Sequence, residues 1–538
     1  MADTTELFSQ QKLVELNTEG YSNLVDVFEE SCKKYPSRVA FSCMGKDLTF
    51  SELERMSRNF SAYLRSEGGL EKGDHIAVQL PNISQYPIVA WGALRAGLVL
   101  VNTNPLYTER ELVHQFQDSG AKALVALVEL LPSIESAIRQ TNVKTVIVTQ
   151  FEGFSQAEVL PDTALANVLG LSALLESTPD RIAPANEATM DDIALLQYTG
   201  GTTGPAKGAV LTHGNIFAGF AIALREHEKY IEGDGESEVF ISPMPLYHVY
   251  GFTSSIVGTC LGGVVSVLIP NPRDIDAMVQ TMKSYRFTGM AGVNTLFSAL
   301  LEHPEFDQID FSALRGTISG GAALVTSIAD EWRERTGSDI FEGYGLSETA
   351  ASTSCNSPDE RKLGTVGKPG FGTEVKVVDV NGKTLESGEE GELLIRGPQV
   401  LKGYWQRPEA TAEAFDAEGW FRTGDVAVIH EDGYISIVDR IKDMILVSGF
   451  NVYPNEIEDV VSSHPDVFEC AAVGVADDRT AEAVKLFVVK TNEALTEKNV
   501  RDFCRQELAA YKVPKYVVFK TELPKSAVGK ILRRELRD

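Results

Sequence analysis

Apolar and polar residues alternate with two different periods along the first part of the chain. Short apolar runs at His75 to Leu80, Lys122 to Leu127 and Lys144 to Thr149 predict buried strands, whereas Ser22 to Lys34 and Ser84 to Arg95 carry apolar residues at helical spacing. Strands and helices that alternate in this way predict parallel sheets covered by helices.

The same block contains one more strand and a helix start. Leu98 to Asn102 is a further apolar run, and Thr108 and Glu111 stand at the spacing of a capping box that opens a helix to Asp118. Residues 151–190 are polar and weakly patterned, so we expect a surface connection there. A second block of alternating elements extends from the glycine-rich stretch near residue 200 to about residue 345.

The pattern changes twice in the C-terminal part of the chain. Gly364 to Asp439 is rich in glycine and has short β-type runs at residues 374–378 and 392–395, which predicts a distorted β-barrel subdomain. From Asp443 onward the pattern is strand, helix, strand, strand, helix, strand, typical of a small α+β domain. The expected fold class is therefore α/β, with two parallel-sheet subdomains, the β-barrel subdomain and a small α+β C-terminal domain.

Composition and charge narrow the class of protein. A chain of 538 residues is too long for one ordinary core, and 43% hydrophobic with 23% charged residues is typical of a soluble globular protein. The net charge of −27 argues against general nucleic-acid binding, which needs a basic face. One local basic cluster comprises Lys525, Lys530, Arg533 and Arg534. It is a candidate phosphate-binding pocket, although such a run is more commonly a solvated helix end.

Cysteine spacing and the apolar segments indicate the compartment. No pair of cysteines has metal-ligand or redox spacing, which predicts reduced thiols in a reducing compartment. The polar, acidic N-terminus is unlike a signal peptide, and the apolar tract from Ile256 to Pro270 is short for a membrane span. We expect a cytoplasmic protein; peripheral contact with the inner face of the cell membrane and a homodimer are left open. The six cysteines are Cys32, Cys43, Cys260, Cys355, Cys470 and Cys504.

The stretch from Leu196 to Gly208 carries the strongest chemical signal. It follows an apolar run, Ile193 to Gln197, and combines four glycines, three threonines and Lys207 without an acidic residue. Glycines let backbone N–H groups approach an anion, hydroxyls donate further hydrogen bonds and a lysine supplies charge, so the stretch predicts a polyphosphate-binding loop. It is not a Walker A loop, because Lys207 lies between Ala206 and Gly208. A flexible, hydrated turn is the alternative for the loop taken alone.

Two further segments suit the binding of a carboxylate and a flat ring. Pro243 to His248 is a rigid turn that presents His248. This histidine could line a pocket near the carboxylate of a substrate, or it could be an ordinary structural histidine. The small residues Ser319 to Ala322 would let a flat ring lie against the backbone, or would simply let a helix pack closely.

Three more segments suit nucleotide and magnesium binding. In Glu342 to Thr349, a tyrosine between glycines suits base stacking, and Ser347 with Glu348 suits phosphate and Mg²⁺, with a capped turn as the alternative. Asp425 follows a tight turn and could accept hydrogen bonds from a ribose diol, or belong to an ordinary hairpin. Lys530 lies in a turn from which its ammonium group could reach out of its own domain, although a surface lysine is the commoner case.

In order and spacing, these segments resemble the adenylate-forming enzymes, the superfamily of acyl-CoA synthetases, luciferases and peptide-synthetase adenylation domains. The likeness covers essentially the whole chain. The general loop pattern of that superfamily is Tyr-Thr-Ser-Gly-Thr-Thr-Gly, and Gly200 stands here in place of the serine. This replacement looks like the bacterial long-chain fatty acid–CoA ligases, as do Ala206 to Gly208, Asn271 to Asp274, Gly292 to Phe297, Lys442 to Val460 and Leu523 to Leu536.

The resemblance implies a role for each matched position. Lys530 would catalyse adenylation, His248 would border the acyl carboxylate, Lys442 would be the hinge and Gly449 would line the pantetheine tunnel. Glu348 would be catalytic and, with Thr199, close to Mg²⁺. Residues 1–439 would form the N-terminal adenylation domain, 440–442 the hinge and 443–538 a mobile lid. The implied ATP-binding set is Thr199, Gly200, Gly201, Thr202, Thr203, Gly204, Lys207, Gly320, Gly321, Ala322, Glu342, Gly343, Tyr344, Gly345, Ser347 (where threonine is more usual), Asp425 and Arg440.

The implied activity joins a fatty acid to coenzyme A at the expense of ATP, which leaves AMP and pyrophosphate through an acyl-adenylate. A medium-chain or aryl acid–CoA ligase would use the same residues. A non-catalytic nucleotide- or lipid-binding relative would be expected to lack Lys530, Glu348 or Asp425, and all three are present. A peptide-synthetase adenylation domain is less expected because no carrier segment follows Asp538. An ordinary ATPase or kinase would release ADP.

Overall fold

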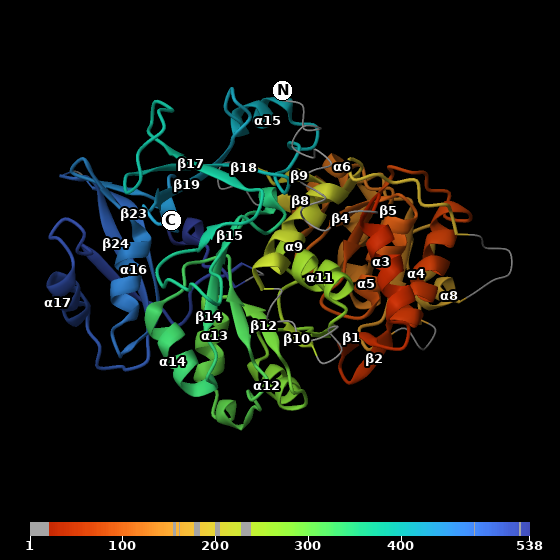
Figure 1. The fold of residues 1–538 in the computed structure, drawn as a ribbon, viewed down its shortest axis with the longest axis horizontal. Coiled ribbons are helices and arrows are strands. Elements are labelled where there is room, and N and C mark those ends of the chain that lie inside the picture. Colours follow the sequence, from red (N-terminus) through yellow and green to blue (C-terminus); the bar gives the residue numbers. More distant parts are fainter. Residues whose placement is uncertain are drawn as a thin grey trace.

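The first of four described sheets lies in the N-terminal part of the molecule (Figure 1). The computed structural model describes residues 21–153, 158–160, 162–176, 183–199, 205–227, 238–477, 479–526 and 529–537. The strand order is β7-β6-β5-β3-β4-β8-β9, and neighbouring strands are parallel except β8 and β9. The strands are β3 (His75–Gln79), β4 (Val99–Asn102), β5 (Ala123–Leu127), β6 (Thr145–Thr149), β7 (Val168–Gly170), β8 (Ile193–Thr199) and β9 (Lys207–Thr212).

The second sheet mixes strands from both ends of the large domain. Its order is β16-β15-β14-β13-β12-β10-β11-β1-β2, so the early strand β1 pairs in parallel with β11, more than two hundred residues later in the chain. The central strands from β14 to β1 are parallel, and the edge pairs are antiparallel. The strands are β1 (Val39–Cys43), β2 (Lys46–Thr49), β10 (Val239–Ser242), β11 (Val265–Leu268), β12 (Gly289–Gly292), β13 (Gly316–Ser319), β14 (Ile340–Tyr344), β15 (Ser354–Cys355) and β16 (Lys368–Pro369).

Helices pack on these sheets, and their ends follow the local sequence. The capping box predicted at Thr108 opens α6, where the Thr108 N–H donates to Glu111 Oε2 at 2.8 Å. Trp91 of the fully buried α5 stacks on Phe28 of α3, with ring centroids 4.5 Å apart. The helices are α3 (Leu24–Lys34), α4 (Phe50–Arg65), α5 (Gln85–Arg95), α6 (Glu109–Ser119), α7 (Leu131–Arg139), α8 (Leu171–Leu175), α9 (His213–His227), α10 (Val249–Gly251), η3 (Phe252–Val257), α11 (Gly258–Gly262), α12 (Ile275–Lys283), α13 (Asn294–Leu301) and α14 (Thr326–Thr336); short 3₁₀ turns are η1 (Val128–Leu130), η4 (Phe306–Gln308) and η5 (Ser347–Thr349).

The stretch expected to be a surface connection is partly built into the fold. β7 pairs with β6 at the edge of the first sheet, and α8 buries Leu171, Leu174 and Leu175. A strand of three residues and a helix of five are too short to show a hydrophobic period in sequence. The prediction of a surface connection was therefore wrong for these buried residues.

The glycine-rich part forms a four-stranded antiparallel sheet in chain order, β17 (Glu374–Val378), β18 (Glu390–Arg396), β19 (Phe421–Ile429) and β20 (Ile435–Arg440), joined by α15 (Pro408–Ala414). Both predicted β-type runs lie in it. Its register places Asp425 of β19 opposite Arg440 of β20.

The C-terminal elements occupy one end of the molecule, away from the N-terminal helices (Figure 1). They are β21 (Ile445–Val447), β22 (Phe450–Val452), α16 (Pro454–Ser462), β23 (Val467–Asp477), β24 (Ala481–Lys490), α17 (Glu497–Glu507), β25 (Tyr516–Phe519) and η6 (Arg533–Leu536). The single strand expected first is a hairpin, because Ser448 and Gly449 turn the chain with φ of +54° and +84°. The α/β class with a separate C-terminal domain is confirmed.

Candidate active site

A cavity of about 1070 Å³ lies where the large domain meets the C-terminal segment. Its walls come from the strand ends of both large sheets, from the helical run α10–η3–α11, from the four-stranded sheet and from residues 525–535. Segments from nearly the whole chain thus meet around one space.

The predicted phosphate loop begins at the cavity wall. Thr199, the last residue of β8, lines the cavity, and Lys207 opens β9 with its ammonium 5.5 Å from the Tyr404 ring centroid. Tyr404 in turn donates its hydroxyl to Glu348 Oε1 at 2.9 Å. Tyr404 therefore links the Lys207 end of the loop to Glu348, and Thr199 at the other end pairs with Lys207 across β8 and β9. Gly200, Gly201, Thr202, Thr203 and Gly204 lie outside the described residues.

A buried carboxylate forms one corner of the site. Asp425 is only 2% exposed and accepts a hydrogen bond from the Tyr344 hydroxyl at 2.6 Å, while Arg440 Nε lies 3.1 Å from its other oxygen. Tyr344 is separated from Asp425 by about eighty residues in sequence. The predicted base-stacking and ribose-binding residues are thus in direct contact, flanked in the cavity wall by Gly343, Gly345, Ser347 and Glu348.

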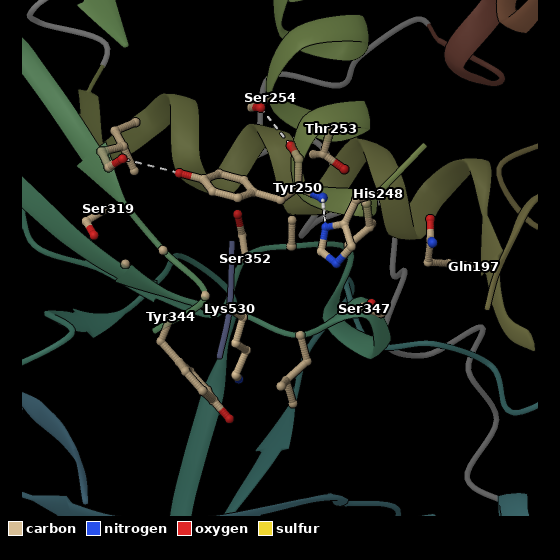
Figure 2. A pocket seen from close by; sticks show the side chains of 18 of the residues that line it. Gln197, His248, Tyr250, Thr253, Ser254, Ser319, Tyr344, Ser347, Ser352 and Lys530 are labelled. Carbon is tan, nitrogen blue, oxygen red and sulfur yellow. Dashed lines mark hydrogen bonds between the residues drawn. The ribbon is translucent and has the colours of Figure 1, made fainter. Parts of the chain in front are cut away.

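Three buried hydroxyls of cavity-lining residues have no hydrogen-bond partner among the described residues. They belong to Ser319, at the end of β13, to Thr253, in η3, and to Ser354, in β15, and Figure 2 labels the first two. Buried polar atoms normally find a partner, so a ligand or water is expected to supply one here. Gly320 and Gly321 follow Ser319 in the wall, and Gly321 has φ of +83°.

His248 is held as a neutral hydrogen-bond donor. It caps α10, and its Nδ1 accepts the N–H of Tyr250 at 3.3 Å, which leaves the ring proton on Nε2. Burial, followed by the nearby charge of Lys530, lowers the pKa of His248 to about 4. The ring is therefore uncharged near neutral pH and can donate to an anion in the cavity.

Lys530 enters the cavity from the C-terminal segment. Figure 2 places it with Tyr344 on one side of the space and His248 with Tyr250 on the other. Burial, followed by the charge of Arg440, lowers the pKa of Lys530 to about 8. The large domain supports this turn, because Thr295 Oγ1 donates to the carbonyl of Gly529 at 3.2 Å.

The structure separates some predicted residues from the cavity. The described lining includes Lys442 but not Lys207, Ala322, Glu342, Asp425 or Gly449. Glu342 is buried behind the wall, where Leu324 N–H donates to its Oε1 at 3.0 Å and burial raises its pKa to about 7. Gly449 lies in the β21–β22 turn, with nothing within 4 Å of a Cβ built there.

One whole wall of the site contains none of the predicted site residues. Tyr250, Ser254, Gly258 and Gly262 line the cavity at intervals of four residues along α10–η3–α11. This spacing places them on one helical face. The i, i+4 glycine pair was a signal in the sequence, but the tract was considered only as a membrane-span candidate.

The sequence matches two family descriptions in chain order. Residues 28–405 match the AMP-binding enzyme family, and residues 456–530 match the AMP-binding enzyme C-terminal domain. The chain belongs to the AMP-binding enzyme family. Members of this family use ATP and coenzyme A, typically with Mg²⁺, so the resemblance to adenylate-forming enzymes is confirmed.

Individual relatives cover nearly all of the chain. A long-chain-fatty-acid–CoA ligase of Escherichia coli O157:H7 is 46% identical over 97% of this chain and 96% of its own length. A long-chain-fatty-acid–CoA ligase of Bacillus subtilis (strain 168) is 34% identical over 95% and 94% of the two chains. A crystal structure of an anthranilate CoA ligase with anthranoyl-AMP has a TM-score of 0.86 at 27% identity and 96% coverage of both chains. Within the described residues, no helix is both long and apolar enough to cross a membrane.

Proposed function

We propose that the protein is an AMP-forming long-chain fatty acid–CoA ligase. The observation that carries the proposal is the single cavity that joins Lys530, His248 and the Tyr344–Asp425–Arg440 cluster, in a chain 46% identical to a ligase of that name. The implied ATP-binding residues, the hinge at residues 440–442 and the lid at 443–538 are part of this proposal.

The first half-reaction brings two anions together. A carboxylate oxygen attacks the α-phosphorus of ATP, the bond to the bridging oxygen breaks and pyrophosphate leaves. Lys530 supplies a cation between carboxylate and α-phosphate, and His248 Nε2–H donates to the carboxylate and orients it. A cavity that holds these groups fixed lowers the barrier through positioning and prearranged charge.

The residues around Glu348 fit a magnesium ion bound together with ATP. Glu348 and the Thr199 hydroxyl offer oxygen donors at the cavity wall, and burial raises the pKa of Glu348, an effect that a cation would offset. Mg²⁺ is usually held by one or two carboxylates plus substrate phosphates, so a single protein carboxylate is sufficient. When bound, the ion would neutralise phosphate charge, and Lys207 and the loop before it would contact the same phosphates.

The second half-reaction needs a different lining. The thiol of coenzyme A attacks the acyl carbon, and AMP leaves with the electron pair of the broken C–O bond. Lys530 occupies the cavity in this arrangement, whereas Gly449 lies outside its lining. A rotation of the C-terminal domain about Lys442 would exchange the two and open a path for pantetheine.

Pyrophosphate release distinguishes this function from its alternatives. We expect saturated fatty acids to trigger release of pyrophosphate and AMP, with acyl-CoA formed when coenzyme A is added. A response confined to medium-chain or aromatic acids would identify the second candidate, which the anthranilate CoA ligase structure favours. Release of ADP would indicate a kinase or ATPase, and no turnover with any acid would indicate a binding protein.

The rate of adenylate formation should fall at alkaline pH. The lysine cation is present below its pKa and lost above it, so kcat/KM should decline as pH rises through about 8, the pKa of Lys530. His248, with a pKa of about 4, should add no acidic limb near neutral pH. ATP–pyrophosphate exchange measured against pH tests this expectation, with Lys530→Arg as the variant that keeps its charge. A profile that stays flat well above pH 8 would show that the cation is not required.

A further inference from the structure

Beyond the carboxylate end, the cavity continues as a slot between a helical face and a sheet face. Tyr250, Ser254, Gly258 and Gly262 form the helical wall. The facing wall comes from neighbouring parallel strands whose paired positions all line the cavity: Phe240 with Gly289, Gly289 with Gly316, and Ile318 with Phe341. Paired positions of parallel strands share one face of the sheet, so the slot follows the strands away from their C-terminal ends.

Phenylalanine rings lie directly on the glycines of this slot. A Cβ added to Gly258 would lie 2.8 Å from the Phe220 ring, and one added to Gly289 would lie 2.9 Å from the Phe240 ring. At Gly316 the distance to the Phe341 ring would be 3.1 Å. Flat rings over bare backbone leave a narrow apolar channel, which suits an unbranched alkyl chain.

The far end of the slot is polar and charged. Glu238, whose side chain is 8% exposed, forms an ion pair with Arg315 and accepts the Thr288 hydroxyl at 2.7 Å. These residues stand immediately before β10, β13 and β12, at the N-terminal edge of the sheet. An alkyl chain cannot replace the hydrogen bonds of this ion pair, in which Glu238 is buried and Arg315 is partly buried, so pushing the cluster aside would be costly.

We propose that the Glu238–Arg315 pair, with Thr288, forms the stop that limits the length of the acyl chain. This inference rests on the proposed ligase function and adds a structural limit on the length of the acyl chain. From Tyr250 to Gly262 the helical wall would advance by roughly 18 Å at the α-helical rise of about 1.5 Å per residue, and the π-helical turn η3 (Phe252–Val257) makes this an upper value. Carbon–carbon bonds of about 1.5 Å advance an extended chain by about 1.3 Å each, so the slot holds at most about fourteen carbons.

Bulky substitutions at two depths of the slot test this limit on chain length. Val264 lines the deep end, because Val265 N–H donates to the carbonyl of Glu238 at 2.9 Å, and Ser254 lines the helical wall nearer His248. Val264→Phe should lower the ratio of kcat/KM for tetradecanoate to that for octanoate by at least about tenfold, since each methylene denied burial costs roughly fourfold. Ser254→Phe should move the optimum to shorter acids than Val264→Phe does. Equal losses for octanoate and tetradecanoate in Val264→Phe would overturn the proposal.

Removing the stop should lengthen the preferred acid. The double variant Glu238→Ala/Arg315→Ala removes both charges together and leaves neither unpaired. Its ratio of kcat/KM for octadecanoate to tetradecanoate, measured by pyrophosphate release, should rise at least about tenfold over the parent protein. Thermal unfolding checks that the double variant is folded. An unchanged ratio in the folded variant would contradict the proposed stop. Absence of pyrophosphate release from the parent protein with every saturated acid would instead refute the ligase function.

Discussion

Replacing Lys530 with alanine is expected to slow adenylate formation by ~10²–10³-fold while thiolation of a supplied acyl-adenylate stays within about threefold. A donor placed where transition-state charge develops typically contributes ~3–4 kcal/mol. Lys530 meets that description in the first half-reaction, because the C-terminal segment brings its ammonium group into the cavity that His248 lines from the opposite side. In the second half-reaction the thiol attacks an acyl carbon that is already activated, and we propose that Lys530 has moved away.

The two half-reactions can be measured separately. ATP–pyrophosphate exchange reports adenylation, and acyl-CoA formation from synthetic acyl-adenylate reports thiolation. Lys512→Ala is a matched control, since this lysine of the same domain pairs with Glu456 at 2.5 Å and is not among the described cavity residues. Both rates should stay within about twofold in the control. Equal loss of both half-reactions in Lys530→Ala would refute the division of labour.

Replacing Lys442 with proline is expected to have the opposite effect, with thiolation slowed ~10²-fold or more and single-turnover adenylation reduced less than about tenfold. Lys442 lies in the turn between β20 and β21, where the described backbone donors are Ile441, Asp443 and Met444. Proline would fix φ at 442 and restrict residue 441, which stiffens the connection. A thiol path left misaligned by as little as 1 Å can cost ~10² in rate.

A second variant separates the effect of losing the Lys442 side chain from the effect of a stiffer hinge. Lys442→Ala removes the ammonium group but leaves the backbone free to rotate, so its thiolation should stay much closer to that of the parent protein. Rapid-quench measurement of adenylate and acyl-CoA in one turnover gives both rates. If single-turnover adenylation fell as far as thiolation in Lys442→Pro, the hinge role would be wrong.

Helices and strands were predicted well where the residues that determine them are close together in the sequence. The capping box at Thr108 and the β-type run at residues 374–378 lie where expected, because their determinants are neighbours in sequence. The hairpin at Ser448 and Gly449 and the short α8 were missed, since the first depends on positive φ at a non-glycine residue and the second on packing against α4. Pairing of β1 with β11 across more than two hundred residues had no local signal at all.

The sequence by itself determined the chemistry of this protein. Residue types that bind phosphate, a base, a ribose and a carboxylate are contiguous in short motifs. Such motifs can be interpreted without knowledge of the fold. Only the tertiary structure decided which of them touch, as Tyr344 and Asp425 do, and how the slot ends at Glu238 and Arg315. The depth of a cavity depends on strand register and helix packing, which bring together side chains that are distant in sequence and therefore cannot be read from any one stretch of it.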